Sequence, residues 1–274
     1  MCAGAQTEHW RCHRLAPIVK SGEPGHSTAV DRFPRTESVA SIRHTPVVTN
    51  RLLDALPSDD RRRLLAVSEP VDLVFADVLY KPGDRLNHVY FPTRSFISLI
   101  MPVDASSSLE VGLIGNEGMF GIPLVLGVDI SPVGAVVQGA GPALRINAPL
   151  FCRELGRSPA LQREIDRYVF VRLSQFAQTA GCTRFHVVEA RLARWLLMTQ
   201  DRAHSDSFHV TQEFLAMMLG VRRVGVTKAA SSLQKRKLIH YTRGNISVLD
   251  RRGLKAASCG CYKADRDAYD RILG

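Results

Sequence analysis

No part of the sequence is apolar for long enough to cross a membrane. None of its 274 residues lies in an apolar run of the roughly 18–20 residues that a membrane-spanning helix needs. An apolar segment of the kind found in secretory signals is also missing, because Glu8, His9 and Arg11 interrupt the start of the chain. We therefore expect no membrane partner and a cytoplasmic location.

Cysteine is scarce and scattered. The six cysteines, at positions 2, 12, 152, 182, 259 and 261, are too few for a disulfide scaffold, so we expect thiols in a reducing compartment. Cys259 and Cys261 together supply only half of a metal site, and Cys182 is expected to be a small buried side chain. No Cys/His/Glu grouping at ligand spacing surrounds the histidines of the C-terminal part, which are His186, His204, His209 and His240. The sequence therefore predicts no metal.

Patterns typical of catalysis are missing as well. There is no nucleophile–base pair, and the turn at Gly115-Asn-Glu-Gly does not match a phosphate-binding glycine loop. The composition, with 45% hydrophobic and 23% charged residues, is that of an ordinary globular protein with a sizeable core. We therefore expect no enzyme.

Acidic residues are outnumbered, and the excess of positive charge is local. The chain has 36 Lys+Arg against 26 Asp+Glu, a net charge of +10. Residues 184–255 hold 14 of the basic and 5 of the acidic residues, a net charge of +9 in one segment. Clustered positive charge is typical of nucleic-acid binding, which needs a basic surface and not only a basic average.

The chain divides into segments of different pattern. Residues 1–48 are rich in proline and have no apolar period, which indicates a flexible arm, or a reading frame that starts too early. From about 71 to 146, seven short β-branched and aromatic runs alternate with turn residues, which predicts a small antiparallel barrel or sandwich. The expected strands include Leu73-Val-Phe, Val78-Leu-Tyr, His88-Val-Tyr-Phe and Phe96-Ile-Ser-Leu-Ile.

A helix of over twenty residues is expected after Pro149. Its apolar side chains recur in steps of three and four along one stripe, which needs a partner surface. That partner is either the chain's own β-domain or the same helix of a second copy. The stripe consists of Leu161, Ile165, Val169, Leu173, Phe176 and Ala180.

The segment from Thr211 to Gln234 has the pattern of a helix-turn-helix. Thr211 is a good N-cap, Gly220 suits a left-handed turn residue, and a hairpin at Arg243-Gly-Asn would form a wing. We expect Val221, Val224, Val226 and Leu233 to anchor the second helix. Gly225 inside that helix suggests close approach to DNA or to a neighbouring helix.

Polar and basic side chains of this segment are candidates for DNA contact. Arginine can form two hydrogen bonds with guanine, and a helix N-terminus can meet a phosphate. Three cations alone are more typical of a solvated surface helix, but the turn glycine, the wing and the local charge favour DNA. The candidates are Thr211, Gln212, Arg222, Arg223, Thr227, Lys228 and Ser231.

Two stretches give the chain a family resemblance. Residues 210–254 and the motifs Leu79-Tyr-Lys-Pro-Gly-Asp and Glu110-Val-Gly-Leu-Ile-Gly-Asn-Glu-Gly resemble those of the Crp/Fnr family of bacterial transcription regulators. The resemblance implies an α+β fold with an antiparallel β-roll of the cyclic-nucleotide-binding type (jelly-roll-like) at 49–152 and a dimerisation helix at 153–183. A winged helix-turn-helix at 184–256 and a tail at 257–274 would follow.

The same resemblance implies partners and limits the sensor. Duplex DNA with an inverted repeat, a second copy of the chain and RNA polymerase are the expected partners. Ile122 and Pro132-Val133 stand where cyclic-AMP-binding members have a glutamate and an arginine pair, so a cyclic phosphate would lack a cation there. Cys2 and Cys12 are too far apart in sequence for the family's iron–sulfur site. We predict no cofactor, and the alternative function is a ligand sensor whose winged helix binds a protein.

Overall fold

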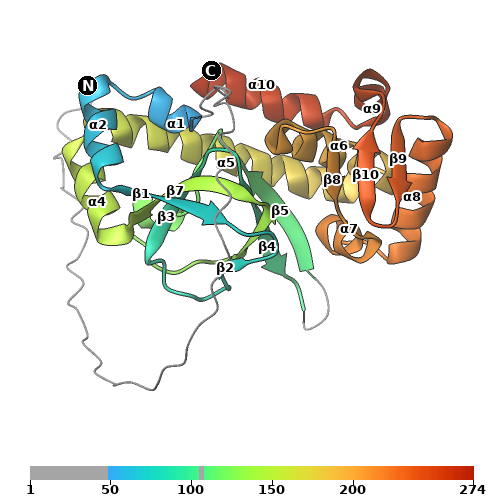
Figure 1. The fold of residues 1–274 in the computed structure, drawn as a ribbon, viewed down its shortest axis with the longest axis horizontal. Helices are drawn as coiled ribbons and strands as arrows, with labels where there is room; N and C mark the ends of the chain where they lie inside the picture. The colour runs from blue at the N-terminus through green and yellow to red at the C-terminus, as the bar shows by residue number, and fades with distance from the viewer. Residues whose placement is uncertain (1–48, 105–107) are drawn as a thin grey trace, which may run out of the picture. The chain divides into compact units, whose positions relative to one another are not determined.

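The computed structural model describes residues 49–104 and 108–274, which belong to one compact unit (Figure 1). The arm expected at 1–48 lies outside the described residues. The helices are α1 (Arg51–Asp54), α2 (Ser58–Ala66), α3 (Ile122–Val125), α4 (Ala148–Arg157), α5 (Pro159–Phe185), α6 (Val188–Ala203), α7 (Gln212–Leu219), α8 (Arg223–Lys235), α9 (Arg251–Ala257) and α10 (Cys261–Leu273). The strands are β1 (Ser68–Leu73), β2 (Val78–Tyr80), β3 (His88–Pro92), β4 (Phe96–Pro102), β5 (Ser108–Ile114), β6 (Gly134–Gly139), β7 (Gly141–Asn147), β8 (Ser207–His209), β9 (Ile239–Thr242) and β10 (Asn245–Val248).

Strands β1 to β7 form two antiparallel sheets, as the alternating strand and turn signals predict. One sheet has the order β1-β7-β3 and the other the order β2-β6-β4-β5. The expected strand at Leu73-Val-Phe is displaced, because β1 ends at Leu73 and the next two side chains, Val74 and Phe75, are exposed. The fold class is confirmed, although this strand boundary is wrong.

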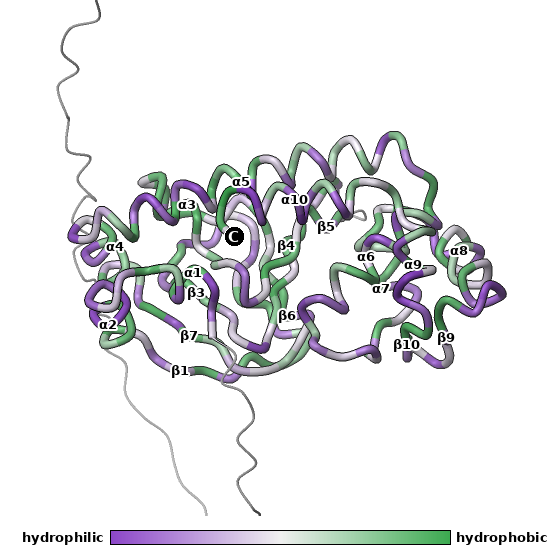
Figure 2. Tube along the Cα trace, turned by 90° about the horizontal axis from the view of Figure 1, so that it is seen from above, coloured by the Kyte–Doolittle hydropathy of each residue, from purple (hydrophilic) through white to green (hydrophobic). Residues whose placement is uncertain are grey.

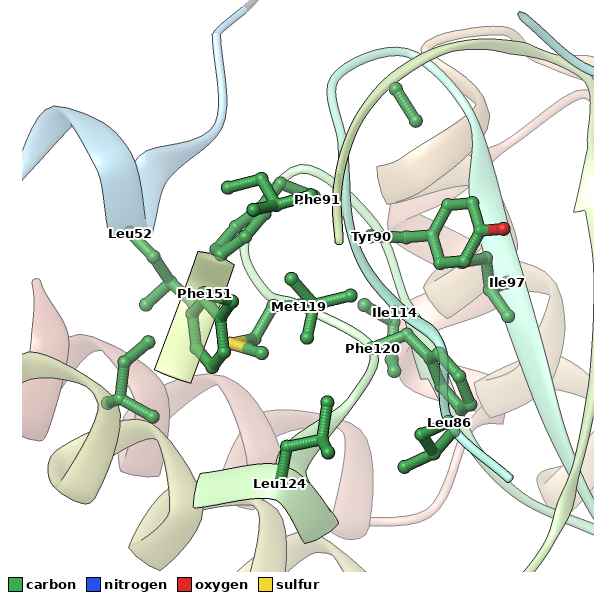
Figure 3. Packing of buried hydrophobic residues seen from close by; sticks show 14 of the residues in the cluster. Leu52, Leu86, Tyr90, Phe91, Ile97, Ile114, Met119, Phe120, Leu124 and Phe151 are labelled. Atoms are coloured by element: carbon green, nitrogen blue, oxygen red, sulfur yellow. The ribbon is translucent and has the colours of Figure 1, made fainter. Parts of the chain in front are cut away.

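Side chains from both sheets fill one core. Tyr80 stacks on Phe120 with their ring centroids 5.4 Å apart, and Tyr90 packs on Phe120 at a tilted angle. Figure 3 shows Tyr90 and Phe120 beside Ile97, Ile114 and Leu86, with Met119 near Phe151 of α4. The interior of this β-domain is therefore occupied by its own aromatic and aliphatic groups.

Helix α5 begins where the sequence provides start signals. Ser158 accepts a hydrogen bond from the Leu161 N–H at 3.0 Å, and Pro159 occupies the first helical position. The N-terminal part of the predicted apolar stripe, Leu161 and Ile165, is buried in the core of the β-domain. Val169 and Phe176 pack against that core and are half-buried, whereas Leu173 and Ala180 are exposed. Only part of the stripe therefore packs on the chain's own β-domain, and its pairing with a second copy stays a prediction.

The C-terminal residues, expected as a tail, contain the regular helix α10. It runs alongside α5 in Figures 1 and 2. Tyr269 donates a hydrogen bond to the carbonyl of Glu117 at 2.8 Å, and Asp265 pairs with Arg194 at 2.5 Å. The last helix is thus fastened both to the β-domain and to α6.

A second core belongs to the helices and strands from α6 onwards. Strands β8, β10 and β9 form a small antiparallel sheet beside α7 and α8, and Leu196, Leu215 and Leu233 are among the fully buried side chains. The Trp195 indole donates a hydrogen bond to Glu110 Oε1 of β5 at 3.0 Å, which links this core to the β-domain. Among the described residues, no helix is both long and apolar enough to cross a membrane.

Candidate nucleic-acid interface

Helix α7 is capped as its sequence predicts. Thr211 has an extended backbone, and its hydroxyl accepts a hydrogen bond from the Phe214 N–H at 3.1 Å. Gly220 follows the helix in the left-handed conformation, with φ at +60°. A Cβ at this position would lie 2.9 Å from Leu109 Cδ1, the movable end of a side chain, so the left-handed backbone is the reason that glycine is favoured here. The predicted turn is confirmed.

Helix α8 presents one face to the core and the other to solvent. Val226 and Leu233 are buried as expected, together with Ala229 and Ala230. Val224 does not anchor the helix, because 65% of its surface is exposed. The reason is its place on the helix: it lies one turn before Lys228, and both belong to the outward face. The expectation that Val224 is a core residue is wrong.

The predicted DNA-contacting residues lie on this outward face or beside it. Gln212 accepts a hydrogen bond from the Thr227 hydroxyl at 2.8 Å, which joins α7 to α8. Arg223 forms an exposed ion pair with Glu213 at 2.8 Å. The exposed members of the set are Thr211, Arg222, Arg223, Thr227, Lys228 and Ser231, and Gln212 is half-buried.

The wing adds a cation that the sequence analysis did not include. Strands β9 and β10 are joined through Arg243 and Gly244, both of which have positive φ. Gly244 lies close to His209, because an added Cβ would meet the imidazole at 2.8 Å. Arg243 is exposed at the tip of this hairpin. Its place in the sequence, directly before the hairpin glycine, could have identified Arg243 as an exposed cation at the tip of the wing.

The basic residues of residues 184–255 fall into two groups. Several arginines form internal hydrogen bonds or ion pairs. Arg191 donates to the Leu219 carbonyl, Arg194 pairs with Asp265, and Arg202 pairs with Glu117. Among the described residues, Arg223 pairs with Glu213 and Arg236 pairs with Glu189, whereas the other exposed cations in and around α8 and the wing pair with no carboxylate. These cations are Arg222, Lys228, Lys235, Lys237 and Arg243. Five of the exposed cations without an ion pair therefore lie at α8 and the adjacent hairpin, and the others in this segment are Arg184 on α5 and Arg252 and Lys255 on α9.

Among the residues that the structure describes, Gly225 has no neighbour that requires a glycine. A Cβ placed there would meet only Val221 Cγ2, at 4.0 Å. Close approach to a neighbouring helix, one of the two reasons suggested by the sequence, is therefore wrong. Close approach to DNA stays a prediction.

One grouping of Cys and His side chains could not be expected from the spacing of these residues in the sequence. Cys182, His186, Cys259 and Cys261 bring their ligand atoms within 4.8 Å of one another. The sequence does not reveal this grouping, because the first two positions are more than 70 residues from the other two. We refer to these four residues as the Cys/His cluster.

Comparisons with known proteins agree with this architecture. A family model described as a Crp-like helix-turn-helix domain matches residues 190–257. The c-di-GMP responsive global regulator CLP of Xanthomonas campestris is similar in structure, with a TM-score of 0.58 and 19% identity over 70% of this chain and 99% of that chain. No curated protein matches the sequence.

Two further solved structures share the fold. A putative transcriptional regulator of the Crp/Fnr family from Eubacterium rectale has a TM-score of 0.60 and 14% identity, over 75% of this chain and 96% of that chain. A transcriptional regulator of the same family from Thermus thermophilus has a TM-score of 0.58 and 20% identity, over 69% of this chain and 98% of that chain. Because these identities are low, the likeness shows a shared fold and does not show what this chain binds.

Proposed function

The chain carries a Crp-like helix-turn-helix domain on the fold of Crp/Fnr regulators, and we propose that it is a transcription regulator that binds duplex DNA through α8. The observation that carries the proposal is the outward face of this helix. Its cations are exposed, and α8 contains no acidic residue. Such a face suits the phosphates and base edges of a major groove.

Each side chain on the face has a role that follows from its chemistry. Arg222 and Arg223, at the N-terminus of α8, can form paired hydrogen bonds with guanine O6 and N7. Lys228, one turn further, suits a phosphate. The exposed Val224 between them offers methyl groups to the C5-methyl group of thymine. Base preference should therefore include guanine and thymine.

Glu213 competes with DNA for Arg223. Both side chains of this ion pair are more than 60% exposed, so the pair is worth about 0–1 kcal/mol and can be exchanged for a base contact. The wing would add Arg243 as a phosphate contact outside the major groove. Glu213 thus tunes affinity without preventing binding.

The second copy that an inverted repeat requires would pack on α5. Exposed positions recur along this helix at alternating steps of four and three, which is the period of a coiled-coil seam. Phe170 and Leu173 are 57% and 61% exposed, unusually high for large apolar side chains. The seam, as we define it, consists of Asp166, Phe170, Leu173, Ala177, Ala180 and Arg184.

The β-domain would act as a sensor that does not use the cyclic-nucleotide phosphate site, since Ile122 and Pro132 offer neither a cation nor a hydroxyl there. A cytoplasmic location and contact with RNA polymerase follow from the proposed role in transcription.

The proposal is tested by fluorescence anisotropy with DNA selected by the full-length protein. Arg223→Ala should weaken binding to the selected sequence by about 1–3 kcal/mol, because it removes a base contact. Lys228→Ala should weaken binding to all sequences similarly and reduce the salt slope by about 1. Glu213→Gln should tighten binding, because it releases Arg223 from its ion pair.

A matched control lies on α2. Arg62 is an exposed arginine paired with Asp59, so Arg62→Ala removes the same charge far from α8 and should leave affinity unchanged. Equal losses for Arg62→Ala and Arg223→Ala would mean that only total charge matters. Binding of a protein partner, unaffected by charge reversal at Arg222 and Arg223, would instead favour the protein-binding alternative.

A further inference from the structure

The Cys/His cluster joins two parts of the chain that are distant in sequence. Cys182 lies in the last turn of α5, and His186 is the C-cap residue of the same helix. Cys259 lies in the turn after α9, and Cys261 is the first residue of α10. The cluster therefore connects the end of the long helix to the start of the last one.

Local structure explains why these side chains converge. Cys182 and His186 are four residues apart, so they lie on one side of the helix end, and the His186 N–H donates to the Cys182 carbonyl at 3.1 Å. On the other side, the Tyr262 N–H donates to the Cys259 carbonyl at 3.3 Å and closes a tight turn. Each segment thus contributes two ligand atoms from a short, hydrogen-bonded unit.

The distances are those of ligands around a single small ion. Cys182 Sγ and Cys259 Sγ are 3.5 Å apart, and Cys261 Sγ lies 3.5 Å from His186 Nδ1. With Zn–S and Zn–N bonds of about 2.3 and 2.0 Å, a tetrahedron has S···S and S···N edges of about 3.8 and 3.5 Å. The cluster therefore needs only small side-chain movements to surround one ion.

An iron–sulfur cluster or a disulfide fits the distances and the residues of the cluster less well than a single ion does. An iron–sulfur cluster places its own iron and sulfide atoms between the thiolates, which must then stand farther apart than the 4.8 Å limit here. A disulfide between Cys182 and Cys259 would use two groups and leave Cys261 and His186 without a role. Three sulfurs and an imidazole are instead a common tetrahedral zinc set.

The surroundings support a site that carries negative charge. The three cysteines are buried, with 1%, 8% and 3% of Cys182, Cys259 and Cys261 exposed. The Gln178 amide donates to Cys261 Sγ at 2.9 Å, as outer groups do around a metal thiolate. Three thiolates around a divalent ion leave one negative charge, and the buried Arg194 interacts electrostatically with Cys182 and Cys259.

We propose that Cys182, His186, Cys259 and Cys261 bind one Zn²⁺ ion in a tetrahedral site that ties α10 to the end of α5. On binding, each protonated thiol releases its proton to solvent, and the imidazole binds through Nδ1. The site lies at the junction between α5 and α6, and α6 leads from it toward the helix-turn-helix. The bound ion would fix this junction and the last helix together, and the proposal is independent of DNA binding.

The test uses full-length protein with its thiols reduced and counted under anaerobic conditions. Metal analysis should give about one Zn²⁺ per chain, and Co²⁺ should give the visible spectrum of a tetrahedral thiolate site that Zn²⁺ abolishes. X-ray absorption of the zinc form should show three sulfurs and one nitrogen. This spectrum identifies the ligands even if a cysteine variant fails to fold.

Variants then assign the ligands. His186→Gln and Cys261→Ser should each weaken Co²⁺ and Zn²⁺ binding at least tenfold, and Cys152→Ser, which alters a cysteine on α4 outside the cluster, should not. The proposal is overturned by fully reduced protein that binds no Co²⁺ or Zn²⁺. A Cys182–Cys259 disulfide in protein purified without reductant that still binds metal normally, or equal loss in Cys152→Ser, would overturn it too.

Discussion

Glu110 is a buried carboxyl group that joins the β-domain to the helices of the C-terminal part. It accepts hydrogen bonds from the Trp195 indole, at 3.0 Å, and from the Ser98 hydroxyl. Burial raises its pKa to about 7, and the hydrogen bonds and the charges of Arg202 and Arg194 offset this only in part. The carboxyl group therefore changes protonation near neutral pH.

This pKa predicts a pH-dependent stability. The folded protein holds the Glu110 proton between the ordinary pKa of 4.5 and about 7, whereas the unfolded chain releases it, so stability falls as the pH rises through this window. We expect Glu110→Gln to remove about 2–3 kcal/mol of this fall. Denaturant unfolding at pH 5 and pH 8 measures it. An identical pH dependence in wild type and variant would contradict the assignment.

Single residues differ in how far the sequence could predict them. Gly220 could be predicted because many helices end at a glycine in the left-handed conformation. Val224 could not, since a valine beside arginines fits either face of a helix until its neighbours are known. The ion pair of Arg223 with Glu213 joins two helices, so it depends on their packing.

Helix α5 shows what apolar spacing can and cannot predict. Steps of four residues rotate a stripe by about 40° each around a helix of 3.6 residues per turn. The predicted stripe therefore begins at Leu161 on the β-domain and reaches the exposed side at Leu173. The exposed seam has the 3.5-residue period of a coiled coil. Its apolar pattern cannot be recognised in the sequence, because members such as Ala177 and Arg184 are small or charged.

The seam predicts that one exposed substitution separates two copies. Leu173→Glu should give a monomer. The fold of that monomer should keep its thermal stability, because the Leu173 side chain is largely exposed in its own chain. Sedimentation equilibrium measures the mass. Leu249→Glu makes the same change at a leucine that is equally exposed, at 61%, but lies after β10. Dissociation by both variants, or by neither, would argue against α5 as the interface.

The whole chain separates its charge by role. Arginines paired with carboxylates hold α6, α10 and the β-domain together, and α8 and the wing carry five exposed cations without a carboxylate partner among the described residues. The sequence could show that the excess charge lies within residues 184–255, but not which cations are free, because ion pairs form between distant segments. The Cys/His cluster escaped prediction for the same reason.

The most direct test of the central claim is selection of DNA by the full-length protein from a random duplex pool at moderate salt. We predict enrichment of an inverted repeat whose half-sites are centred one helical turn, about 34–36 Å, apart. The Arg223→Ala variant should lose preference at a guanine within each half-site. Recovery of unenriched DNA, or of the same sequence with the same preference after Arg223→Ala, would contradict the claim that α8 reads DNA.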